Sequence, residues 1–514
     1  MAGSTASRTE SVEPAVPVAV AGDEPPPFAW RPVAVLAAGI AALLAATSGR
    51  YDYHRDELYF RQLGRHLAWG YVDQPPLTPL LARIATAVLG DSVWALRVPC
   101  LLSVVATVFV VALIARELGG GRTAQVLAAA GVLSVFPLIS GHVLLTSTVD
   151  LVIWSVLILF VIRALHRDAP RWWLAAGTVV GVGLYNKHLV VLLLLGLAGG
   201  LLLAGPRRVL RSGWLWAGVA LALVIGAPNL VYQATHDWPQ LAMAEALRRN
   251  KGDEARITLV PFQLILLGPL LVPVWVAGLV SLLRNPALRA VRALGVAYPL
   301  MCVLLFALAG QPYYTVGLLL ALYAVGSVAT ARWLAAGGPR RWVGTVAVVG
   351  ANAVLSAVMA IPVLPLPVLA QTPIPAANQT VADQIGWPAY VRQVADVHRM
   401  LPPDERAGAV IVTGNYGEAG ALDRYGRGYG LPRAYSGQNE LYRQGPPPES
   451  ARTVVVVGGF SDAYLAARFA SCVVAGRLDN GVGVDNEEQG LPVRICRDPR
   501  GSWRELWPRF QHFD

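Results

Sequence analysis

Long apolar runs limit how this chain can fold. They begin at Val33 and continue to about residue 361. An α-helix of roughly 20 apolar residues crosses a hydrocarbon core, where backbone amides must find their hydrogen-bond partners within the same segment. The sequence therefore predicts a polytopic α-helical membrane protein of about eleven transmembrane helices. We place the spans at 32–48, 92–114, 123–140, 149–165, 172–186, 188–205, 214–232, 259–282, 293–309, 314–333 and 343–361.

Composition excludes several other classes of protein. Hydrophobic residues make up 55% of the 514 residues and charged residues only 14%, whereas about 25% of residues are charged in an average globular protein. This excludes a simple cytosolic enzyme, a disordered protein and a small disulfide scaffold. The net charge is +10, but the arginines lie in short loops and not in a basic stripe interleaved with aromatic residues. We expect the lipid bilayer as a partner, and no nucleic acid.

The arginine-bearing loops predict an orientation in the membrane. Basic residues in short loops concentrate on the cytoplasmic side, and here they occupy alternate connections, for example at Arg116, Arg163 and Arg207. The N-terminal tail, residues 1–28, is then cytoplasmic, and it is rich in Ala, Ser, Glu and Pro, which indicates disorder. An odd number of crossings leaves the C-terminal region outside. Arginine-rich, lysine-poor usage favours a bacterial plasma membrane.

We divide the chain into the tail, a transmembrane catalytic domain at 29–361 and a small extracytoplasmic α/β domain at 362–514. The last of these has normal polar content and short β-branched runs at 408–413 and 453–457. Gly414, Gly417 and Gly420 follow the first run, with spacing typical of a strand-to-helix turn and not of a dinucleotide loop. Cys472 and Cys496 would form a disulfide if this domain faces an oxidising compartment.

The first outer loop, residues 49–91, carries the densest group of reactive side chains. It contains Asp56 and Glu57 between arginines, and an Asp73-Gln74-Pro-Pro element further on. A carboxylate can accept a proton from a hydroxyl group, and arginines hold phosphate groups through paired hydrogen bonds. Any one of these acids alone would be read as a surface salt bridge, but the cluster favours transfer from a sugar phosphate to an alcohol. The arginines concerned are Arg55 and Arg61.

Further polar groups lie at predicted outer helix ends, and each has a structural alternative. Asp150 would cap a helix, and Lys187, beside His188, would extend to the lipid headgroups. Tyr313 and Tyr314 would belong to an aromatic belt. Topology nevertheless gathers these residues at the depth of Asp56. Two basic residues on the outer side also indicate a local task, although a solvated loop explains them equally well: Arg248 and Arg249.

This pattern resembles glycosyltransferase family 39, which includes relatives of protein O-mannosyltransferases and of the bacterial aminoarabinose transferase, with the GT-C fold. The resemblance covers about residues 32–335. It rests on the Asp56-Glu57 pair, the Pro-Pro element, the acid Asp150, Lys187 and the Tyr313-Tyr314 turn.

The resemblance implies an inverting enzyme that moves a sugar, commonly mannose, from a polyprenyl-phosphate donor to an acceptor hydroxyl at the outer face. Asp56 would be the catalytic base, Glu57 would support it, Asp150 would be a second acid and Lys187 would lie near the donor phosphate. The acceptor would be a protein, an envelope glycan or a secreted metabolite. No nucleotide sugar and no cofactor are implied, and no residue spacing indicates a metal site.

The sequence departs from the family at one element, and a second class of protein competes with the enzyme. Related transferases often have Glu-Lys-Pro-Pro where this chain has Asp73-Gln74-Pro-Pro, so phosphate binding would depend on Arg55, Arg61 or Lys187, with Arg248 and Arg249 as additional candidates. A transporter or flippase of lipid-linked sugar would place its polar residues near the membrane midplane, often in repeated halves. Neither feature is present in the sequence, so we favour the transferase.

Overall fold

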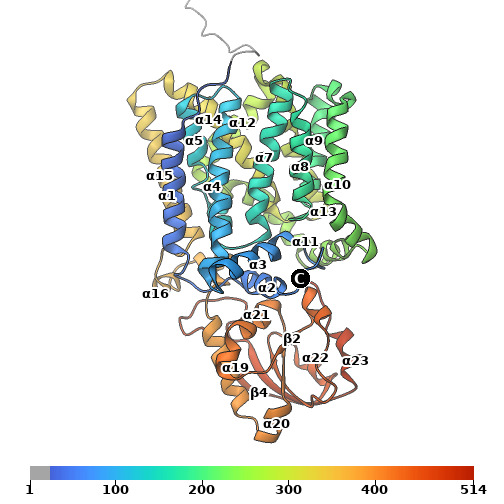
Figure 1. Cartoon of the computed structure of the whole chain (residues 1–514). Coiled ribbons are helices and arrows are strands. Elements are labelled where there is room, and N and C mark those ends of the chain that lie inside the picture. The colour runs from blue at the N-terminus through green and yellow to red at the C-terminus, as the bar shows by residue number, and fades with distance from the viewer. Residues whose placement is uncertain (1–23) are drawn as a thin grey trace, which may run out of the picture.

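The computed structural model describes residues 24–514 as a bundle of helices with a smaller sheet-containing region at one end (Figure 1). Of the predicted disordered tail, residues 1–28, the first 23 residues lie outside the described residues. Its last part differs from the prediction, because Arg116 Nε donates to the Pro26 carbonyl at 2.7 Å and Gln125 Nε2 donates to the Pro27 carbonyl at 3.1 Å. Residues 26 and 27 therefore pack against the bundle.

Most of the predicted crossings are long apolar helices. Among the described residues, seven segments are long and apolar enough to cross a membrane, or nine if each of two bent helix pairs counts as one span. The protein is therefore a multi-pass membrane protein. The seven contain α1 (Trp30–Thr47), α4 (Val93–Glu117), α7 (Thr146–His166), α10 (Gly213–Thr235), α13 (Arg292–Leu308), α14 (Val316–Ala335) and α15 (Pro339–Ala360). Two predicted spans are shorter helices, α8 (Trp172–Gly183) and α9 (Val190–Ala204).

Two predicted spans are broken. The third consists of α5 (Arg122–Ala130) and α6 (Val135–His142), bent by 64°, and the eighth joins the end of α11 (Pro239–Ile265) to η2 (Pro269–Leu271) and α12 (Val272–Arg284), bent by 69°. Gly268 at the second break has a φ of +88° and precedes a proline, a combination that ends a helix. Most of the connection expected at 233–258 is the first part of α11.

The segment predicted as the first outer loop, residues 49–91, contains two helices, α2 (Arg55–Leu63) and α3 (Leu77–Leu89). They lie across the end of the bundle, between the long helices and the sheet-containing region (Figure 1). Leu80, Ile84 and Val88 share one face of α3 and are exposed. This spacing is typical of a helix that lies in the membrane interface with its apolar side toward lipid.

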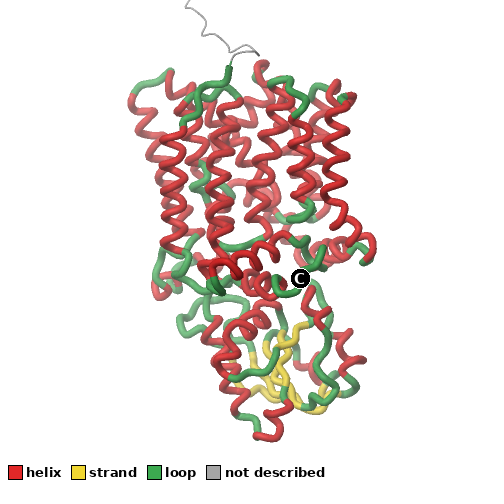
Figure 2. The backbone as a smooth tube through the Cα atoms, viewed as in Figure 1, coloured by secondary structure: helices red, strands yellow, loops and turns green. Residues whose placement is uncertain are grey.

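The C-terminal region is built on a mixed five-stranded sheet (Figure 2) with the order β2-β1-β3-β5-β4. Strands β1 and β2 pair in parallel, as do β1 and β3, whereas β5 is antiparallel to both β3 and β4. A disulfide joins Cys472 in β4 to Cys496 in β5. The strands are β1 (Val410–Thr413), β2 (Ala434–Ser436), β3 (Thr453–Val457), β4 (Phe469–Arg477) and β5 (Pro492–Pro499).

The helices of this region are short. The α-helices are α16 (Leu366–Leu369), α17 (Ile374–Ala377), α18 (Gln379–Ala382), α19 (Trp387–Arg399), α20 (Pro403–Gly408), α21 (Tyr416–Tyr425), α22 (Asp462–Ala466) and α23 (Trp503–Leu506). Single 3-10 turns complete the chain, at η1 (Arg207–Arg211), η3 (Pro286–Val291), η4 (Pro312–Thr315), η5 (Gly426–Tyr429), η6 (Asn439–Gln444) and η7 (Trp507–Arg509).

Helix α21 attaches this region to the first outer loop, because it packs directly against α2. A Cβ atom at Gly417 would lie 2.9 Å from the Arg55 Cβ, and one at Gly420 would lie 2.7 Å from the Leu58 Cβ. The glycines after β1 therefore serve a strand-to-helix turn and a close helix contact. This contact brings the N-terminus of α21 to the N-terminus of α2.

Candidate active site

Helix α2 begins where its sequence supplies a capping box. The side chain of His54 accepts the Asp56 backbone N–H at 3.1 Å, and Glu57 Oε2 accepts the His54 backbone N–H at 2.8 Å. Such reciprocal bonds satisfy amides that have no partner inside the helix. Asp56 is thereby held in the first turn of α2, beyond the last residue of the first membrane helix.

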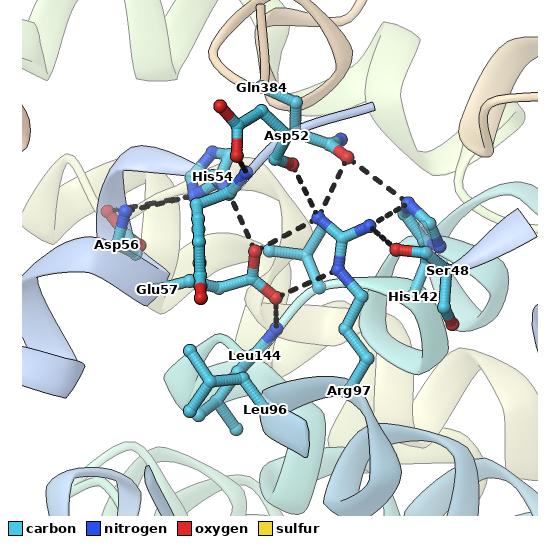
Figure 3. A network of polar contacts seen from close by, with 12 residues as sticks. Ser48, Asp52, His54, Asp56, Glu57, Leu96, Arg97, His142, Leu144 and Gln384 are labelled. Carbon is cyan, nitrogen blue, oxygen red and sulfur yellow. Dashed lines mark hydrogen bonds and ion pairs between the residues drawn. The ribbon is translucent and has the colours of Figure 1, made fainter. Parts of the chain in front are cut away.

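Glu57 lies at the centre of a buried polar network (Figure 3). Its two carboxylate oxygens accept hydrogen bonds from Arg97 Nε at 3.1 Å and Arg97 Nη2 at 3.0 Å, and Oε1 also accepts the Leu144 N–H at 3.2 Å. Its exposed fraction is 0%. Its carboxylate has no access to a substrate, and its bonds to His54 and Arg97 lie at the start of the helix that carries Asp56.

Arg97, in α4, connects Glu57 to three other parts of the chain. Its guanidinium contacts the Ser48 carbonyl at 2.6 Å after α1, His142 Nε2 at 3.1 Å at the end of α6, and Gln384 Oε1 at 3.1 Å after α18. A buried ion pair loses much of its attraction to desolvation, so further hydrogen bonds are needed to hold it. The network therefore locks the start of α2 to the bundle and to the C-terminal region.

Asp56 lies at the edge of that network, beside His54 (Figure 3). Its side chain is 27% exposed. Oδ1 accepts a hydrogen bond from the Tyr416 hydroxyl at 2.8 Å, and no hydrogen bond to Oδ2 is formed within residues 24–514. One oxygen of this carboxylate is anchored and the other is available to a ligand.

Tyr416 connects Asp56 to Asp73, another acid of the segment 49–91. Its ring stacks on Tyr59 with centroids 4.6 Å apart, and the Tyr59 hydroxyl donates to Asp73 Oδ1 at 3.1 Å. Burial raises the pKa of Tyr416 well above its ordinary value, so the hydroxyl stays protonated and donates. Burial also raises the pKa of Asp73 to about 7, so this group titrates near neutral pH.

A second cluster lies at the same end of the bundle. The Lys187 ammonium, in the turn between α8 and α9, lies 4.6 Å from the ring centroid of Tyr314 and 5.5 Å from that of Tyr313, which are cation–π distances. Asp150 is 7% exposed, and its Oδ1 accepts a hydrogen bond from Asn186 Nδ2 at 3.5 Å. It lies in the second turn of α7, so the alternative that it caps the helix is wrong.

These side chains line a narrow pocket with a cavity volume of about 10 Å³, which is room for about one water molecule. Helix α6, the second half of the bent pair, contributes Phe136 to the pocket. The Phe136 ring stacks on that of Tyr313 with centroids 5.3 Å apart. Asp56 is one of the charged groups in the surroundings of Tyr313. The pocket itself is too small to hold a sugar phosphate.

Other residues predicted to bind the donor make different contacts. Arg61 pairs with Asp91 and Asp423, and thus ties α2 to the C-terminal region. Arg248 and Arg249 are exposed on α11 and both pair with Glu245 on the same helix. The structure does not bring these three arginines into contact with Asp56 or Lys187, because nearer carboxylates bind them.

The other residues predicted to bind the donor are Arg55, His188 and Gln74. Arg55 pairs with Glu487 and places its guanidinium 4.7 Å from the ring centroid of Tyr416. His188 bonds to Asn229 on α10 at 2.8 Å, and so supports the bundle. Gln74 is buried, and its carbonyl accepts the Tyr71 N–H at 2.9 Å. Of these three residues, only Arg55 contacts the side chain that bonds to Asp56, which is Tyr416.

Sequence reasoning missed Arg97 and Tyr416. Arg97 carried a signal, because a charged residue near the start of an apolar span is a candidate by default. Tyr416 carried none, since its hydroxyl meets Asp56 only through the fold. Among the described residues, no group of three or more His, Cys, Asp or Glu side chains could hold a metal ion.

Comparison with known proteins agrees with this architecture. The family described as dolichyl-phosphate-mannose-protein mannosyltransferase matches residues 73–232. The crystal structure of ArnT from Cupriavidus metallidurans bound to undecaprenyl phosphate is similar at 17% identity and a TM-score of 0.60, covering 90% of this chain and 97% of that chain. Its apo structure is similar at 15% identity and a TM-score of 0.58, with the same coverage.

A third similar structure is the arabinofuranosyltransferase AftD from Mycobacteria, at 16% identity and a TM-score of 0.51, covering 91% of this chain and 40% of that longer chain. No curated protein matches the sequence. Since these identities are low, the likeness shows the fold: the chain has the GT-C fold of membrane glycosyltransferases.

Proposed function

We propose that this protein is an inverting glycosyltransferase that moves a sugar from a polyprenyl-phosphate donor to an acceptor hydroxyl. The observation that carries the proposal is the arrangement of an accessible carboxylate, Asp56, and a cation, Lys187, at one end of a GT-C bundle. The similarity to a structure bound to undecaprenyl phosphate supports the choice of donor.

The reaction assigns a separate task to each group. Asp56 accepts the proton of the acceptor hydroxyl, whose oxygen attacks C1 of the sugar while the bond from C1 to the phosphate oxygen breaks. The polyprenyl phosphate leaves from the opposite face, so the configuration at C1 inverts. Lys187 neutralises the charge that grows on the departing phosphate, and electrostatic stabilisation of this kind is usually the largest catalytic contribution.

Substrates and location follow from the same proposal. The sugar is mannose or a related hexose or pentose, and the acceptor is a protein, an envelope glycan or a secreted metabolite. The arginine-rich loops favour a bacterial plasma membrane with the N-terminus in the cytoplasm. The site and the C-terminal region, residues 362–514, then face outward, where lipid-linked sugars are consumed.

The test is release of polyprenyl phosphate. Purified protein in detergent is incubated with labelled polyprenyl-phosphate mannose or arabinose and a panel of hydroxyl acceptors, and the lipid products are separated. Asp56→Asn should lower turnover by about 10²- to 10⁴-fold, the usual contribution of a positioned base. Asp253→Asn is the matched control, because that carboxylate is 97% exposed on α11.

Two outcomes contradict the proposal. A carrier of lipid-linked sugar would leave the bond between sugar and phosphate intact with every acceptor while still moving the lipid across vesicle membranes. Near-normal turnover by Asp56→Asn would remove Asp56 as the base.

A further inference from the structure

The C-terminal region contributes a side chain to the site. Tyr416 is the first residue of α21, and its hydroxyl donates to Asp56 Oδ1 at 2.8 Å across 360 positions of sequence. Arg55 in the same turn also pairs with Glu487 of this region, but among the described residues only Tyr416 donates a hydrogen bond to the Asp56 carboxylate. The contact is therefore a direct link between the C-terminal region and the carboxylate assigned as the base.

The position of the Tyr416 ring is well determined by its neighbours. The Arg55 guanidinium lies 4.7 Å from the ring centroid, and the Tyr59 ring stacks at 4.6 Å. The Tyr416 backbone N–H donates to Gln438 Oε1 at 2.7 Å. Gly417 leaves room for α2 at the next position. Ring and backbone are both fixed, so the hydroxyl has a defined direction.

This geometry has a chemical consequence for Asp56. A hydrogen bond donated to one carboxylate oxygen restricts rotation of the side chain. It leaves Oδ2 as the oxygen that can accept a proton from a hydroxyl group. A base that is already oriented needs no rearrangement at the moment of proton transfer.

We propose that Tyr416 is a positioning residue for Asp56, so that the C-terminal region completes the active site. This inference rests on the proposed function. A contact that only docks the region onto the bundle is the competing explanation, and the same helix supplies its control. Tyr425, the last residue of α21, donates to Asp52 Oδ1 at 2.6 Å. Both tyrosines link α21 to an aspartate of the first outer loop, but only Tyr416 bonds to Asp56.

The other groups around Asp56 must stay the same if the two explanations are to be separated. They come from the loop itself, from the turn before α14, from the segment after α18 and from α21. The charged or titratable neighbours are His54, Arg55, Glu57, Asp73, Tyr313, Asp383 and Tyr416. Replacing Tyr416 by Phe keeps the ring and all of the other groups.

The experiment compares Tyr416→Phe with Tyr425→Phe in the full-length protein, using release of polyprenyl phosphate as the assay. Hydrogen bonds to charged groups contribute about 1.5–3 kcal/mol, so Tyr416→Phe should lower kcat by about 10- to 100-fold. The KM for the lipid donor should change by less than about twofold. Tyr425→Phe should leave kcat unchanged.

Two results would overturn the inference. They are an unchanged kcat in Tyr416→Phe, or equal losses of kcat in both variants with matching falls in melting temperature, which would indicate docking alone. These failures are distinct from failure of the proposed function, because in that case the wild-type protein would release no polyprenyl phosphate.

Discussion

Lys187 differs from every arginine of the predicted donor site in having no carboxylate bound to it. Arg55, Arg61, Arg248 and Arg249 all pair with acids. Within the described part of the chain, no carboxylate oxygen lies within 4.0 Å of the Lys187 ammonium, which faces two tyrosine rings instead. A cation held by aromatic faces keeps much of its charge available to an anion.

We therefore expect Lys187→Met to weaken donor binding. Loss of a charge-assisted contact of about 1.5–3 kcal/mol corresponds to a rise in KM for the lipid donor of about 10- to 100-fold. Initial rates over a range of donor concentrations measure this change. Lys251→Met is the control, since that lysine is exposed on α11 and pairs with Asp514. Unchanged saturation in Lys187→Met would contradict a role in donor binding.

At the scale of elements, the contact between α2 and α21 decides whether the site is complete. Gly417 and Gly420 lie where α2 approaches, and the Gly420 position faces both the Cβ and the backbone of Leu58. Only a residue without a side chain allows this separation. The same contact brings Tyr416 to Asp56, so packing and chemistry depend on one helix pair.

Gly420→Ala should therefore reduce both stability and turnover. The added Cβ would lie 2.7 Å from the Leu58 Cβ and 2.9 Å from the Leu58 carbonyl carbon, and overpacking of this kind costs about 1–3 kcal/mol. Thermal unfolding in detergent and the polyprenyl phosphate assay measure the two effects. Gly428→Ala is the control, because nothing lies within 4 Å of a Cβ there. Wild-type turnover in Gly420→Ala would mean that the site tolerates displacement of α21.

At the scale of the whole molecule, two acids of the C-terminal region are buried, Glu418 and Glu488. Burial raises the pKa of Glu418 to about 8 and that of Glu488 to about 7. Glu418 Oε2 accepts the backbone N–H groups of Gly414 and Asn415, which shape the turn into α21. Protonation of these acids is therefore coupled to the part of the fold that carries Tyr416.

Stability should fall as the pH rises from about 5 to 8. The unfolded chain releases these protons near pH 4.5, whereas the folded chain retains Glu418 and Glu488 protonated to about pH 8 and pH 7. Over that window the folded state binds more protons, so the free energy of unfolding falls by up to about 1.4 kcal/mol per pH unit for each group. The stabilising contribution of these two groups is largest below their unfolded pKa.

Melting temperatures in detergent at pH 5, 6, 7 and 8 test this expectation. Glu418→Gln, which resembles the protonated acid, should flatten the pH dependence, while the exposed Glu254→Gln should not. A wild-type melting temperature that rises over this range would contradict the assignment.

The crossings and the polar end of the bundle could be predicted because both follow from local composition. The thickness of the hydrocarbon core sets the length of each apolar run, and the loop arginines alternate with it. The same reasoning selected Asp56, Asp150 and Lys187 as polar groups at one depth. It missed the breaks in two spans, which lie where Gly131 approaches Tyr323 closely and where Gly268 adopts a positive φ, because composition shows neither feature.

Sequence alone was sufficient to establish a membrane bundle with reactive side chains at one end, since lipid requires internally bonded helices wherever the chain crosses. Which of those side chains meet depended on tertiary packing. Glu57 was buried by Arg97 from a different helix, and Asp56 was joined to Tyr416 from a different region. Partners separated by 40 and 360 positions leave no local pattern, because their contact is produced by the packing of whole elements.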